Sequence, residues 1–235
     1  QHSANPDLQN IYGGTRALMM AADGGHEACV QALLRAKANT QLIDNNGRTA
    51  LQWAEIKGHT AIAELIRQHA APPQPAAASP AAPPDAGEPA VSSPASLPVE
   101  IHRSAQRGEL QKVVKWLRKE GPVDALLLSA PTHNGRVSTA SLLHTTSGHG
   151  HLELVRVLLK RGASVDLPTS LGVTALMNAA YYGHPSILRV LLQHSANPDL
   201  QNNYGRTALM VAADGGQEAC VKALLRAKAN TELLD

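Results

Sequence analysis

The fold is decided by the stretch GVTALMNAAYYGHPSILRVLLQHSANPDL, residues 172–200. Thr174 stands where a side-chain oxygen would cap a first short helix, and Gly183 stands where that helix would end. Pro185 suits the first turn of a second helix, in which apolar residues recur at the three- and four-residue spacing of one helix face. The stretch therefore predicts a helix-turn-helix unit, with an inward stripe made of Leu176, Ala180, Ile187, Val190 and Leu191.

The same unit recurs every 33 residues, as the glycine before its second helix shows at Gly25, Gly58, Gly150, Gly183 and Gly216. A segment longer than one 33-residue unit is also duplicated. The ten residues QHSANPDLQN occur at 1–10 and again at 193–202, and residues 17–44 match residues 208–235 at 23 of 28 positions. Self-similarity at a fixed period of this length predicts a solenoid of stacked units.

The unit resembles the ankyrin repeat, because it reads G-x-T-A-L, a short helix, G-H and a second helix ending in L-L. Ala replaces the Pro of the family's T-P-L-H signature. The resemblance covers about 200 of the 235 residues. It implies an all-α ankyrin-repeat solenoid of stacked helix-turn-helix units with short β-turn fingers and a concave face for partners. The signature His occurs only at His144, so we expect weaker finger hydrogen bonding in the other repeats, which carry Met19, Gln52, Met177 and Met210.

The chain divides into two arrays. We assign residues 1–69 to the C-terminal part of one array, with a truncated repeat and two full repeats. Residues 70–98 hold nine Pro and ten Ala in 29 residues, which predicts a flexible linker with no helix or strand packed on either array. Residues 99–235 form a second array of a capping repeat and three repeats, truncated at its C-terminal end. The first residue is Gln, and we expect the chain to be part of a longer protein.

Two segments depart from the repeat pattern. The loop between Gly121 and Thr139 is longer than usual and is expected to protrude as a mobile finger. In residues 12–18, YGGTRAL, an added Gly and a swapped order place Arg16 where Thr207 stands in the sister copy. We expect the helix cap to be lost there, at a cost of about 1 kcal/mol, and the finger to be spoiled.

Composition indicates a globular domain without a demand for nucleic acid or membrane. Hydrophobic residues make up 43% of the chain, and 21 basic and 19 acidic residues are scattered without long runs of one sign. Cys29 and Cys220 both lie in E-A-C-V and are interpreted as buried free thiols. Together with the lack of a leader or a long apolar run, this favours the cytoplasm, with the nucleus as the alternative.

No motif for catalysis or cofactor binding is present. His144, His149 and His151 cluster in HTTSGHGH, but the repeat frame assigns structural places to His144 and His151, and no thiolate or carboxylate stands at ligand spacing. There is no phosphate-binding glycine loop and no G-x-S-x-G elbow. We therefore expect no enzyme activity, cofactor, metal or small-molecule substrate.

The partner-binding residues are assigned from the places that contact partners in the ankyrin family. These are the finger tips and the pair of residues before the glycine that ends the first helix. Tyr181 and Tyr182 are the expected anchors, because a Tyr ring gives a large contact area with few rotatable bonds, and at least one ring is expected to be exposed. The remaining candidates are Val173, Tyr204, Arg206, Asp214, His149, Arg107, Arg48 and Lys57.

Three interpretations of function remain open. The first is a non-catalytic scaffold that binds proteins on the concave surface. The second is a regulatory or targeting segment of a larger enzyme, and the third is a degenerate repeat product with no partner. The arrangement of the arrays is also open, since the end of the second array complements the start of the first. The two could stack within one chain, stay apart, or pair between chains.

Overall fold

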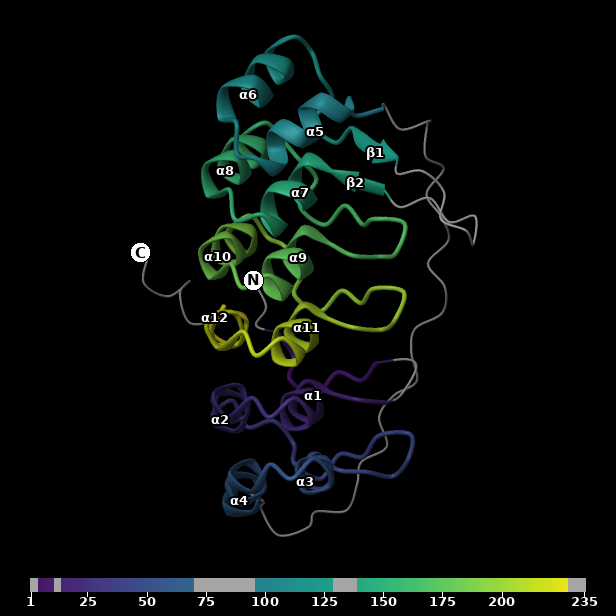
Figure 1. Ribbon diagram of the computed structural model, residues 1–235, viewed down its shortest axis with the longest axis vertical. Helices are drawn as coiled ribbons and strands as arrows, with labels where there is room; N and C mark the ends of the chain where they lie inside the picture. Colours follow the sequence, from purple (N-terminus) through teal and green to yellow (C-terminus); the bar gives the residue numbers. More distant parts are fainter. Residues whose placement is uncertain (1–3, 11–13, 70–95, 129–138, 228–235) are drawn as a thin grey trace.

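The computed structural model describes residues 4–10, 14–69, 96–128 and 139–227. Within these residues, short helices pack in pairs, each pair forming one layer of an elongated stack (Figure 1). The predicted helical solenoid is thereby confirmed. The pairs are α1 (Ala17–Asp23) with α2 (Glu27–Arg35), α3 (Ala50–Ile56) with α4 (Thr60–His69), α5 (Val99–Gln106) with α6 (Leu110–Arg118), α7 (Leu142–Gly148) with α8 (Leu152–Lys160), α9 (Ala175–Tyr181) with α10 (Pro185–Gln193), and α11 (Ala208–Asp214) with α12 (Glu218–Arg226).

A short two-stranded sheet forms the base of the long finger. Strand β1 (Leu126–Leu128) pairs antiparallel with β2 (Thr139–Ser141), and the predicted protruding part between them lies outside the described residues. Leu97 is buried, and its N–H donates to the carbonyl of Leu126 at 2.9 Å. The described end of the predicted linker therefore contacts the second array, although residues 96–98 form no helix or strand and only a single β-bridge, from Ser96 to Leu126. The linker from 70 to 95 lies outside the described residues.

The residues predicted to begin and end the helices do so in the structure. Thr174 and Thr207 each accept a hydrogen bond from the third residue of the following helix, and Pro185 begins α10. Gly183 follows α9 with φ of +75°, a conformation that a side chain would strain. In the stripe, Leu176, Ala180, Ile187 and Leu191 are buried. Val190 is only half-buried, and Leu188 takes a buried place instead.

Two repeats carry a full capping box. In α7 the cap Ser141 and His144 bond reciprocally, and in α3 Thr49 and Gln52 do the same. At the helix cap Gln52 does what His144 does, since its Oε1 accepts the Thr49 N–H at 2.9 Å, while the expectation of weaker finger hydrogen bonding stays a prediction. A glutamine oxygen can reach the same amide as a histidine nitrogen, whereas methionine has no comparable acceptor.

The order of layers in space differs from their order in the chain. The stack runs from α5–α6 through α7–α8, α9–α10 and α11–α12 to α1–α2 and α3–α4 (Figure 1). Helix α11 packs on α1 and α12 packs on α2, so the first array continues the second. Of the three arrangements that the sequence left open, the structure has the two arrays stacked within one chain.

Histidines join consecutive layers. The histidine before each of α2, α4, α8 and α10 donates from Nε2 to a carbonyl at the end of the first helix in the layer before it. His151 reaches Gln106 at 2.7 Å, His184 reaches Gly148 at 3.0 Å, and His59 reaches Asp23 at 3.2 Å. His26 makes the same bond to Asp214 at 2.9 Å, across the contact between the two arrays. The structural role predicted for His151 is confirmed, and His26, His59 and His184 share it.

Arg16 shows where the sequence-based expectation was incomplete. Its side chain makes no cap bond to α1, as predicted, but it is buried and donates to the carbonyls of Gly14 and Ile43 at 3.1 and 2.7 Å. It also donates to the Asp7 carbonyl at 3.2 Å. The Asn10 N–H still donates to the Thr15 carbonyl at 3.0 Å and closes the base of the finger, while residues 11–13 at its tip lie outside the described residues, so the expected effect on the finger stays a prediction.

Candidate functional site: a pocket on the finger side of the inner helices

The candidate site lies where α9, α11 and the finger before α11 meet. Each finger is closed by a backbone hydrogen bond just before its helix, from Thr169 to Val173 at 2.9 Å and from Asn202 to Arg206 at 3.1 Å. The Asn202 side chain also accepts the backbone N–H groups of Tyr204 and Arg206, at 2.9 and 3.0 Å. These local bonds fix the direction in which the finger presents its side chains.

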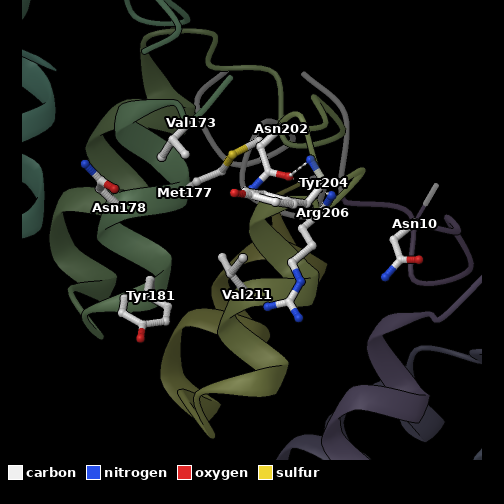
Figure 2. A pocket seen from close by; sticks show the side chains of 9 residues that line it. All are labelled: Asn10, Val173, Met177, Asn178, Tyr181, Asn202, Tyr204, Arg206 and Val211. Atoms are coloured by element: carbon white, nitrogen blue, oxygen red, sulfur yellow. Dashed lines mark hydrogen bonds between the residues drawn. The ribbon is translucent and has the colours of Figure 1, made fainter. Parts of the chain in front are cut away.

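A pocket of about 500 Å³ opens between these elements (Figure 2). Val173, Met177 and Val211 supply apolar walls, while Tyr181 comes from the end of α9 and Tyr204 from the finger. A concave, largely apolar surface with a few polar groups at its edge is the usual form of a binding site. The full lining is Asn10, Val173, Met177, Asn178, Tyr181, Asn202, Tyr204, Arg206 and Val211.

Arg206, one of the polar residues that line the pocket, forms an ion pair with Asp214. Arg206 Nη1 lies 3.0 Å from Asp214 Oδ2, and both side chains are partly exposed. An exposed pair of this kind contributes at most about 1 kcal/mol to stability. It does, however, hold the guanidinium group beside the apolar walls, where a partner could replace water around it.

The two adjacent tyrosines are exposed. Tyr181 has 53% of its surface accessible and Tyr182 has 58%. Their rings meet edge to face, with centroids 5.0 Å apart. The exposure predicted for this pair is confirmed, while its role in binding stays a prediction.

A second, more polar depression adjoins the first and is lined in part by His102, His144, His149 and Tyr182. His144 Nδ1 accepts the Ser141 N–H at 3.2 Å, and its Nε2 donates to the Val173 carbonyl at 3.0 Å. Burial lowers the pKa of His144, so the neutral ring fits both bonds. Burial and the nearby charge of His149 also lower the pKa of His102. Across the described residues, no group of three His, Cys, Asp or Glu side chains could hold a metal ion.

A comparison with protein families agrees with this architecture. The family model for ankyrin repeats in three copies matches residues 2–75, 101–202 and 143–235. The chain belongs to the ankyrin-repeat family. Ankyrin repeats generally mediate protein–protein interaction, and the pocket lies on the surface between inner helices and fingers that was expected to bind partners.

The other candidate residues of this ankyrin-repeat protein do not gather at the pocket. Arg107 lies 3.8 Å from Glu109, Lys57 pairs with Asp23 at 3.1 Å, and the guanidinium of Arg48 stacks 5.0 Å from the centre of the Trp53 ring. His149 is exposed, and its Nδ1 donates to the Thr145 carbonyl at 2.9 Å. The pocket thus joins four candidates, with Asp214 bonded to its rim: Tyr181, Val173, Tyr204 and Arg206.

Sequence reasoning missed the residues between those candidates. Met177 stands at the signature-His position and Val211 stands 33 residues after Asn178, so their place in the repeat could have suggested this surface. Asn10 could not have been found, because it reaches the pocket only through the stacking of the first array on the second.

No helix among the described segments is long and apolar enough to span a membrane.

Proposed function

We propose that this ankyrin-repeat protein is a non-catalytic scaffold whose pocket binds a protein partner through an apolar or aromatic side chain. The observation that carries the proposal is the exposure of Tyr181 and Tyr204, at 53% and 49%, on either side of the walls formed by Val173, Met177 and Val211. Exposed aromatic side chains beside a preformed apolar pocket are typical centres of binding energy in protein interfaces.

The chemistry of the partner follows from the walls. An inserted apolar side chain would cover Val211 and Met177, and the two Tyr hydroxyls would remain at the edge, where they can bond to a partner backbone. Arg206, already paired with Asp214, would favour a polar or acidic group next to the inserted side chain. We place this interaction in the cytoplasm, where the buried thiols Cys29 and Cys220 would stay reduced.

The test compares capture of proteins from a cell extract by three immobilised forms of the chain. These are the wild type, the double variant Tyr181→Ser with Tyr204→Ser, and Leu128→Ser, which removes an equally exposed apolar side chain from β1. We expect partners that bind the wild type and Leu128→Ser but lose at least about tenfold in affinity for the double variant, equal to roughly 1.4 kcal/mol. A photocrosslinker at position 211 should label the same partner. If every captured protein binds all three forms alike, the pocket is not the binding site.

A further inference from the structure

The contact between the two arrays is not crossed by the polypeptide chain. Helices α11 and α12 pack on α1 and α2, yet α4 and α5, which flank the linker, lie at opposite ends of the stack (Figure 1). We call the contact of α11–α12 with residues 4–10 and α1–α2 the array junction. It is a non-covalent interface between two parts of one chain.

The array junction repeats the contacts of a covalent repeat boundary. The Ala4 N–H donates to the Leu224 carbonyl at 3.1 Å, as the Ala196 N–H does to the Leu191 carbonyl 33 residues earlier. A second bond is repeated as well. In the continuous part of the stack the Asn197 N–H donates to the Asp166 carboxylate at 3.1 Å. At the array junction the Asn5 N–H donates to the Asp199 carboxylate at 2.9 Å. By the period of 33, the place of Ala4 belongs to Ala229, which lies outside the described residues.

Side chains complete the junction. His26 donates to the Asp214 carbonyl and lies against Gly216, where an added Cβ would come within 2.6 Å of His26 Nδ1. Gln201 Nε2 donates to the Gln9 carbonyl at 2.8 Å. Cys29 of α2 is buried, and Glu218 and Lys222 of α12 are the charged groups that act on its thiol. Each of these atoms is present at the same place in any other copy of the chain.

We propose that the array junction is also a binding surface for a second copy of this chain, which exchanges its first array to form a two-fold symmetric dimer. Both junctions then form between chains with the bonds described above. The reciprocal exchange leaves neither junction surface bare, as in domain-swapped dimers. Only the linker favours the closed monomer, because it gives the two arrays of one chain a high effective concentration for each other.

The length of the linker therefore decides between monomer and dimer. Five steps between layers, at helix-packing distances of about 8–10 Å, separate the outer layers by roughly 40–50 Å. The residues from 70 to 95 can span at most about 90 Å when extended, at about 3.5 Å for each residue. Removing most of this segment, so that roughly ten residues remain, limits its reach to about 35 Å. A chain shortened in this way cannot close its own junction.

The experiment compares the full chain with this shortened chain by light scattering coupled to size exclusion, and by alkylation of Cys29 read by mass spectrometry. Cys220 is the internal reference, because its Sγ bonds to the Ala179 carbonyl within its own array. We expect the full chain to be a monomer at low micromolar concentration. The shortened chain should have twice the mass of one chain, with Cys29 as protected as in the full chain. A monomeric or aggregated shortened chain with reactive Cys29 would overturn the proposal.

A matched pair of variants of the shortened chain tests whether the dimer uses the array junction. Gly216→Val fills the space of His26, whereas Gly58→Val introduces a similar strain at φ of +75° with no atom within 4 Å of the new Cβ. The first variant should return the shortened chain to the mass of a monomer and make Cys29 reactive, and the second should stay dimeric. Equal behaviour of the two variants would show that association does not use the array junction.

Discussion

The backbone N–H of Ala4 donates a hydrogen bond to the carbonyl of Leu224, at 3.1 Å, and this bond joins the first and last described repeats of the chain. It has the geometry of the bond that ends α10, from Ala196 to Leu191. The solenoid therefore continues across a place where the chain does not, and the order of its layers is a permutation of the order in sequence. Stability at this contact depends on packing and hydrogen bonds alone.

Removal of the His26 ring should loosen the array junction selectively. His26→Ala loses the bond to the Asp214 carbonyl, whose net contribution is on the order of 1 kcal/mol, together with the contact at Gly216. We expect alkylation of Cys29 to accelerate several-fold. The control is His59→Ala, which loses the equivalent bond to Asp23 between α3–α4 and α1–α2 and should lower thermal stability without exposing Cys29. Equal alkylation rates in the two variants would contradict the prediction.

The helices could be predicted from sequence because the signals that form them are local. Thr174, Pro185 and Gly183 act on the backbone within one turn, and they do so in every repeat that carries them. The stacking of the arrays could not be decided in this way. Stacked and exchanged forms make the same contacts and differ only in which chain supplies them, a difference that no local pattern encodes.

Arg16 should stabilise the protein although it removes a helix cap. Arg16→Thr restores the cap of α1, worth about 1 kcal/mol, but loses charged hydrogen bonds to three backbone carbonyls, each worth about 1.5–3 kcal/mol. The three bonds together outweigh the cap, so we expect a net loss of at least about 3 kcal/mol in the free energy of unfolding, measured by urea denaturation. Arg206→Ala, which removes an exposed guanidinium, should cost less than about 1 kcal/mol. An Arg16→Thr variant as stable as the wild type would show that the cap outweighs the guanidinium bonds.

The pH dependence of stability should be reduced when His144 is replaced. Burial lowers the pKa of His144 below the usual 6.5, so the unfolded chain takes up a proton before the folded chain does. Its contribution to stability is present above about pH 6.5 and is lost as the pH falls from there toward the lowered value. His144→Gln, which places at α7 the residue found at Gln52, should lose less stability between neutral pH and pH 5 than the wild type does. Exposed His149→Gln is the control for removal of a histidine, and the measurement is thermal denaturation.

The pocket was predictable only in part. The position of a residue in the repeat indicates which surface it lies on, but not whether that surface has a pocket. Tyr181, Val173, Tyr204 and Arg206 were found from their places in the repeat, and these four line one pocket. Arg48, Lys57 and Arg107 have equivalent places but lie beside partners of their own, in layers near the ends of the stack. The repeat at which a pocket opens depends on the volumes of neighbouring side chains, here Met177 and Val211. It therefore depends on packing between layers.

The bond between Asp44 and Trp53 should couple the last finger to α3. Asp44 is buried. Its Oδ1 accepts the N–H groups of Asn46 and Arg48 at 2.9 and 2.8 Å, and its Oδ2 accepts Trp53 Nε1–H at 3.1 Å. Burial alone would raise the pKa of Asp44, but these bonds together lower it, so the carboxylate stabilises the fold until the pH falls through that lowered value.

Asp44→Asn keeps an oxygen for the two amides but turns an N–H₂ group toward the indole donor, at a cost of about 1–3 kcal/mol at neutral pH. In Trp53→Phe that donor is absent, so the double variant should lose about 1 kcal/mol less than the sum of the single losses. Urea unfolding of the four proteins followed by circular dichroism measures this coupling, and strictly additive losses would show that the side chains of Asp44 and Trp53 act independently.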